Sequence, residues 1–91
     1  MNLRTYNYFE VLFLDRSLIL PAVGEEKCIE LYYKDLVFVK TYNPFEYNII
    51  LTDNNDECYI ISYGNDEKQR DTEYKILMER KKELENVRNK G

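Results

Sequence analysis

The sequence predicts an α+β fold in which about five antiparallel strands, forming an open sheet or a curled half-barrel, precede one long C-terminal amphipathic helix. Up to residue 63, short runs rich in Val, Ile, Tyr and Phe alternate with polar breaks. After Gly64 the residues are good helix formers, with no Pro and no further Gly until Gly91. A length of 91 residues fits a single small domain, 1–91, with an antiparallel sheet in 1–63 and the helix in 64–91.

The first half of the sheet region predicts three strands. Residues 5–14 are dense in aromatic and branched side chains and form the first. Residues 17–20 form a second, which Pro21 limits to a sheet edge or a strand end. In residues 28–33 apolar and polar side chains alternate, which is typical of a half-buried strand.

The second half predicts a further strand and a hairpin. Lys34-Asp35 is a tight turn or a continuation, and residues 36–42 are again a strand. Asn43-Pro44 indicates a turn, because Pro fixes its own φ and disfavours helix at the residue before it. Residues 46–52 and 57–63 are two apolar runs around a polar turn, and we expect them to pair.

Two registers are open to this hairpin, and they bury different side chains. A two-residue turn at Asn54-Asn55 pairs Leu51 with Cys58 and mixes polar with apolar side chains on each face. A three-residue loop, 54–56, gives the pairs Leu51–Tyr59, Ile49–Ile61 and Tyr47–Tyr63. We favour the second register because one face is then continuous and apolar. Its reverse face leaves an Ile50–Ile60 pair that either the helix or a partner must cover.

The C-terminal region predicts an amphipathic helix over about residues 66–89. Its apolar stripe consists of Tyr74, Leu77, Leu84 and Val87, with Met78 widening it. Asn65 or Asp66 can cap the first turn, and Asp71 is the alternative if the helix begins later.

The charge distribution argues against sequence-independent binding to nucleic acid or anionic membrane. The net charge is −4, and it is uneven. Residues 1–63 carry ten acidic and five basic side chains, whereas residues 64–91 carry seven acidic and eight basic ones. The acidity therefore belongs to the sheet region, and nucleic acids and anionic lipids both require a basic patch.

The sequence lacks the motifs of common catalytic and metal sites, so we expect no enzyme, no cofactor and no metal. There is no His, and the three Gly stand singly, so no phosphate-binding loop exists. Residues 53–57 resemble the start of a calcium loop, but Cys58 and Gly64 stand where that loop requires Gly and Glu. No export signal or membrane span is present, so we expect a cytoplasmic protein with Cys28 and Cys58 as reduced, buried thiols.

These features favour a small, acidic, non-catalytic protein-interaction module. Its composition favours residues with A/T-rich codons, which fits a phage or mobile-element protein. We expect such a protein to bind and inhibit a host factor, such as a nucleic-acid-binding protein with a basic surface. The expected partner-binding residues are Glu30, Asp35, Glu46, Asp53, Asp56 and Glu57, with Tyr32, Tyr42 and Tyr59 as aromatic anchors. Two alternatives are binding of nucleic acid or a nucleotide through the tyrosine-rich sheet, and a self-assembling structural subunit, including a homodimer.

Overall fold

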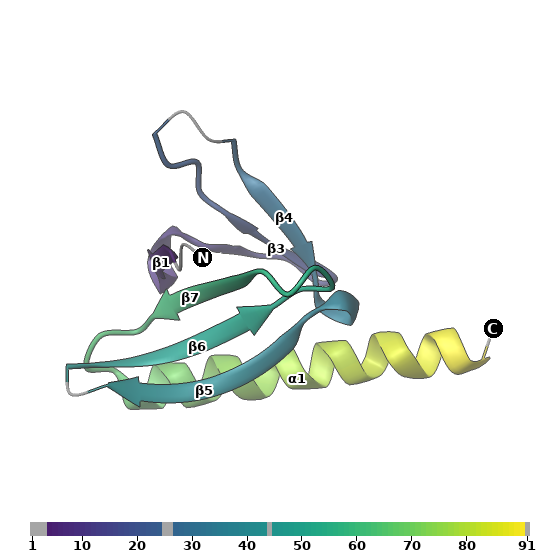
Figure 1. Cartoon of the computed structure of the whole chain (residues 1–91). Coiled ribbons are helices and arrows are strands. Elements are labelled where there is room, and N and C mark those ends of the chain that lie inside the picture. Colours follow the sequence, from purple (N-terminus) through teal and green to yellow (C-terminus); the bar gives the residue numbers. More distant parts are fainter. Residues whose placement is uncertain (1–3, 25–26, 44, 91) are drawn as a thin grey trace.

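A computed structural model of the chain describes residues 4–24, 27–43 and 45–90, with side chains described through Glu85. Seven strands, two short 3-10 helices and one α-helix follow one another within this part (Figure 1). In chain order they are β1 (Arg4–Asn7), η1 (Tyr8–Glu10), β2 (Leu12–Phe13), β3 (Ser17–Leu20), β4 (Ile29–Tyr32), η2 (Tyr33–Asp35), β5 (Val37–Asn43), β6 (Glu46–Thr52), β7 (Cys58–Ser62) and α1 (Glu67–Lys90).

The α+β class is confirmed, but the strands form two open sheets rather than one sheet of about five strands. A four-stranded sheet has the order β1-β7-β6-β5, and a three-stranded antiparallel sheet has the order β2-β3-β4. The first is mixed, because β1 runs parallel to β7. The difference arises within residues 5–14, where η1 interrupts the predicted strand. β1 then joins one sheet, and β2 pairs with β3 in the other.

The hairpin of β6 and β7 has the register of the three-residue loop, as predicted. Leu51 lies opposite Tyr59 and Ile49 opposite Ile61. Asp53 closes the loop, since its backbone N–H donates to the Glu57 carbonyl at 3.0 Å. Asp56 takes the left-handed conformation with φ of 62°, which Asp tolerates better than most residues.

The helix is confirmed, and Asp66 caps it. The Asp66 Oδ1 accepts the backbone N–H of Gln69 at 3.0 Å, which satisfies one of the first-turn donors. Leu77 is fully buried in the core, and Tyr74 and Leu84 pack against it. Met78 does not widen this stripe, because 41% of it is exposed. The predicted contribution of Val87 lies outside the described side chains.

The helix and the second sheet cover the same face of the four-stranded sheet, and a single core lies between them. Figure 1 shows α1 running along one side of β5, β6 and β7, with β3 and β4 at an angle to them. The buried apolar residues are Tyr6, Val11, Leu18, Leu20, Leu31, Tyr33, Leu36, Phe38, Ile49, Leu51, Ile61, Tyr63 and Leu77. The helix therefore does not cover the reverse face, where Ile50 and Ile60 are half-buried and Val37 and Val39 are exposed.

Arg70 joins the start of the helix to the middle of the sheet. Its guanidinium is buried, and Nη1 donates to the carbonyl oxygens of Thr41 at 2.7 Å and Asn48 at 3.3 Å. It also lies 5.2 Å from the centre of the Tyr47 ring. These contacts satisfy a charge that burial alone would penalise.

The cysteines differ from the prediction in one respect. Both are free thiols, but Cys28 is exposed and Cys58 is half-buried. Cys28 directly precedes β4 and is not part of the buried cluster. In the part of the chain that the structure describes, α1 and the 3-10 helices are too short or too polar to span a membrane.

Candidate functional site

A surface pocket between the two sheets gathers several of the predicted acidic residues. The pocket has a volume of about 180 Å³. It is lined by Glu30, Leu31 and Tyr32 of β4, Asp35 and Leu36 at the end of η2, and Asp53, Asn54 and Asn55 of the β6–β7 loop. We call this set the acidic pocket. Its residues come from two separate segments, so the packing of the two sheets creates it.

Glu30 is held in place by two hydroxyl groups, one from β3 and one from β4 itself. Ser17 of the neighbouring strand donates its hydroxyl to Glu30 Oε2 at 2.7 Å. The Tyr32 hydroxyl donates to Glu30 Oε1 at 3.2 Å. The Glu30 charge is the main reason why the pKa of Tyr32 is raised above its usual value. Tyr32 therefore stays a neutral hydrogen-bond donor to the carboxylate at neutral pH.

Asp53 shapes the loop on the opposite side of the acidic pocket. Its Oδ1 accepts the backbone N–H groups of Asn55 at 2.9 Å and Glu57 at 3.0 Å. This is the side-chain turn that Asp favours at loop ends. Its Oδ2 accepts the Tyr59 hydroxyl at 3.3 Å. Burial, followed by the Asp53 charge, raises the pKa of Tyr59.

The carboxylates of the acidic pocket are not neutralised by neighbouring cations. In residues 4–24, 27–43 and 45–85, neither Glu30, Asp35 nor Asp53 forms an ion pair with a Lys or Arg. Three negative charges thus converge around a hollow that also presents an aromatic ring, that of Tyr32. This arrangement suits an incoming cation that can also lie against an aromatic face.

The remaining predicted residues do not line the acidic pocket. Asp56 and Glu57 are exposed on the same loop as Asp53. Tyr42 and Glu46 lie at the other end of the hairpin, about 23 Å along β6 from Asp53 at 3.3 Å per residue. There Glu46 accepts the Ser62 hydroxyl at 2.6 Å. The predicted surface is therefore two separate patches rather than one.

Sequence reasoning missed the polar residues that support the acidic pocket. Ser17 looked like the first residue of a strand, yet its hydroxyl orients Glu30. Asn54 and Asn55 looked like turn residues alone, yet they form one wall. The predicted hairpin register contained one signal for this pocket, because the three-residue loop places Asp53 on the apolar face beside Tyr59.

No metal centre is formed by the described residues, among which no three Cys, Asp or Glu side chains cluster closely enough to hold an ion. Comparison with protein-family models, curated proteins and solved structures finds no match to the chain.

Proposed function

We propose that this protein is a non-catalytic interaction module whose acidic pocket receives a Lys or Arg side chain of a protein partner. The observation that carries the proposal is the convergence of Glu30, Asp35 and Asp53 around one hollow, with no ion pair to a Lys or Arg among the described side chains. Bidentate acceptance by a carboxylate and stacking on the Tyr32 ring are both interactions that Arg makes well. A partner with a basic, nucleic-acid-binding surface fits this chemistry, and occupation of that surface would inhibit it.

The same chemistry argues against direct binding of nucleic acid through the tyrosines of the two sheets. Proteins that stack bases on tyrosines surround them with Lys and Arg, which neutralise the phosphates. Here Tyr32 and Tyr59 each donate a hydrogen bond to a carboxylate. A phosphate approaching either ring would meet negative charge at close range.

The proposal is tested with a labelled Arg-rich peptide whose binding is measured by fluorescence anisotropy at about 50 mM salt. The double substitution Glu30→Gln and Asp35→Asn removes two charges and keeps the side-chain size. At roughly 0.2–1 kcal/mol for each exposed charge pair, binding should weaken by about tenfold.

A matched variant separates the acidic pocket from the overall negative charge. Glu79→Gln and Glu83→Gln remove the same two charges from exposed positions of α1. We expect this control to bind almost as well as the wild type. Equal losses in the two double variants would contradict the proposal. Affinity capture with wild-type and pocket-variant baits, followed by mass spectrometry, then identifies partners that depend on the acidic pocket.

A further inference from the structure

β5 is an edge strand whose outer side has free backbone groups. Tyr47 in β6 and Asp53 directly after it form backbone hydrogen bonds on the β7 side, Tyr47 with Tyr63 and Gly64 and Asp53 with Glu57. The odd-numbered residues of β6 therefore face β7, and the even-numbered ones face β5. Thr41 lies opposite Asn48 and Val39 opposite Ile50, so these β5 residues face β6. Phe38 and Lys40 therefore turn their N–H and C=O groups outward. No described residue forms a hydrogen bond with these four groups.

The helix runs antiparallel to β5 and beside this edge. Near one end, Lys40 lies 3.7 Å from the Asp71 carboxylate and 5.1 Å from the centre of the Tyr74 ring. At the other end, Lys81 Nζ donates to the Leu36 carbonyl at 2.6 Å.

Met78 lies between these two contacts along the helix. Tyr74, Met78 and Lys81 lie on one side of the helix, because they are four and three residues apart. The four residues from Leu36 to Lys40 span about 13 Å, and the seven from Tyr74 to Lys81 span about 10 Å. Met78 is thus level with Phe38, at the centre of the open edge.

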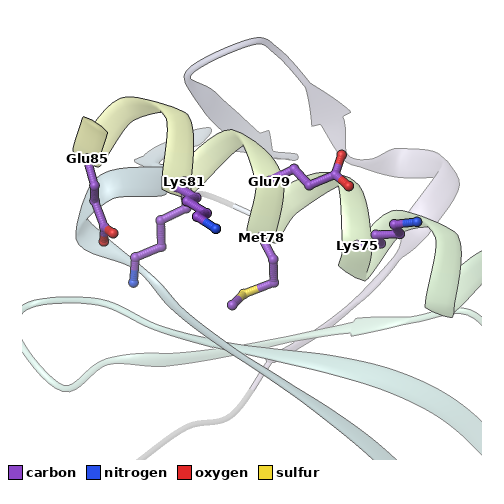
Figure 2. Close-up of a pocket in the computed structure, with 6 residues that line it drawn as sticks. Lys75, Met78, Glu79, Lys81 and Glu85 are labelled. Carbon is purple, nitrogen blue, oxygen red and sulfur yellow. The ribbon is translucent and has the colours of Figure 1, made fainter. Parts of the chain in front are cut away.

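A groove of about 490 Å³ lies along this flank. It is lined by Lys75, Met78, Glu79, Lys81, Lys82 and Glu85, which we call the helix flank. Figure 2 shows Met78 projecting from the middle of the helix, with Lys75 on one side and Lys81 and Glu85 on the other. Three lysines against two glutamates make it positive, in contrast to the acidic sheet region.

We propose that the outer edge of β5 takes an extended, acidic segment of a partner protein as an added strand. Its backbone would pair with the outward groups of Phe38 and Lys40, as in other strand-addition complexes. Alternate side chains of the segment would face the helix flank, where acidic ones meet Lys75 and Lys82. The side chains between them would extend the apolar reverse face beside Val37 and Val39, which are 55% and 47% exposed. This surface is separate from the acidic pocket, and the proposal does not depend on that function.

The charges of the helix flank favour this occupant over a second copy of the chain. Two β5 edges paired around a two-fold axis near Phe38 would bring the two helices together antiparallel at Met78. Lys75 would then lie near Lys81 of the second copy, and Asp71 near Glu85 of the second copy. Like charges in these positions destabilise the pair. An acidic segment instead meets opposite charge at Lys75 and Lys82.

The experiment uses a fluorescein-labelled peptide of eight residues in which Thr and Glu alternate, with the full-length protein and anisotropy as the measurement. Lys40→Pro removes the outward N–H and places a ring at the edge, whereas the bonds of β5 to β6 remain. Lys40→Ala loses the same side chain but keeps the N–H. We expect Lys40→Pro to weaken binding by about tenfold relative to Lys40→Ala. Circular dichroism establishes that both variants are folded.

A surface charge reversal provides the second test, and it does not threaten the fold. Lys82→Glu should weaken binding of the Thr-Glu peptide several-fold, and Lys27→Glu, in the loop before β4, should not. Amide chemical shifts should move at Phe38 and Lys40. The proposal is overturned by equal effects of the two charge reversals, by shifts confined to the acidic pocket, or by absence of binding. A dimeric mass in light scattering that Lys40→Pro abolishes would overturn it in favour of self-pairing.

Discussion

Replacement of Arg70 by Met should destabilise the fold, because Arg70 connects α1 with both strands of the β5–β6 pair. Its two hydrogen bonds to carbonyl oxygens, at 2.7 and 3.3 Å, are charge-assisted and worth about 1.5–3 kcal/mol each. Its contact with the Tyr47 ring adds about 0.5–2 kcal/mol.

Two effects reduce the net cost of this substitution. Burial of the guanidinium carries a desolvation penalty of several kcal/mol, which the Met variant avoids. Met also keeps much of the volume, and the Thr41 and Asn48 carbonyls stay paired across the two strands. We therefore expect a net loss of about 2 kcal/mol, out of a total of roughly 5–13 kcal/mol for a domain of this size.

Urea-induced unfolding followed by circular dichroism measures this loss, and the melting temperature should fall by about 8–16 °C. Asp71→Asn is the matched control. Asp71 accepts from Arg70 Nε at 2.8 Å, but its side chain is 46% exposed, so we expect a loss of about 0–1 kcal/mol. If Arg70→Met stays within about 0.5 kcal/mol of the wild type, the buried guanidinium does not stabilise the helix–sheet contact and the reasoning is wrong.

Leu77→Ala should lower the free energy of unfolding in urea by about 3 kcal/mol, because Leu77 is fully buried; a cost under about 1 kcal/mol would contradict its place in the core. Gly64→Ala should cost about 1–2 kcal/mol in the same assay, from the backbone alone, since φ is +58° and an added Cβ meets open space. Burial raises the pKa of Glu73, so ionisation of this carboxyl lowers the stability of the fold as the pH rises through the unfolded value of 4.5. In thermal melting, Glu73→Gln should therefore be more stable than the wild type at pH 7 and equal to it at about pH 3. A maleimide should label exposed Cys28 faster than half-buried Cys58, and equal rates measured by mass spectrometry would refute this order.

Short-range sequence patterns predicted the hairpin register and the start of the helix. The register of the β6–β7 hairpin follows from alternation alone, because only one register places Ile49 and Leu51 on the same face as Tyr59 and Ile61. Asp66 was one of three predicted caps, with Asn65 and Asp71, because Asp and Asn are favoured directly before a run of helix formers.

The division into two sheets could not be predicted in this way. Residues 5–14 have strand composition throughout, and nothing local marks Tyr8–Glu10 as a 3-10 turn. The break becomes favourable only because β1 can pair in parallel with β7, more than fifty residues away in sequence. Such a connection depends on the packing of the complete chain, which propensities do not encode.

The burial of Arg70 likewise could not be predicted from the sequence. In the sequence it is one basic residue in a charged run, of the kind that most often lies on a solvated helix face. Its burial depends on Thr41 and Asn48 presenting their carbonyls together, which only the assembled β5–β6 pair does. The acidic pocket is similar, because the individual carboxylates were identifiable but their division into two patches depended on the sheet packing.

The two proposed surfaces share a structural support, which is the segment formed by η2 and Leu36. On one side this segment supplies Asp35 and Leu36 to the acidic pocket, and on the other it leads directly into β5. Two adjacent helix residues form hydrogen bonds in this region. Arg80 donates to the Leu14 carbonyl at 2.9 Å, and Lys81 donates to the Leu36 carbonyl at 2.6 Å. Tyr33, fully buried, donates its hydroxyl to the same Leu14 carbonyl at 2.6 Å. Lys81 thus ties Leu36 directly to the helix, and Tyr33 shares the Leu14 carbonyl with Arg80. A displacement of α1 by a strand added at β5 would therefore be transmitted to Asp35, and the two surfaces would bind their partners with coupled affinities.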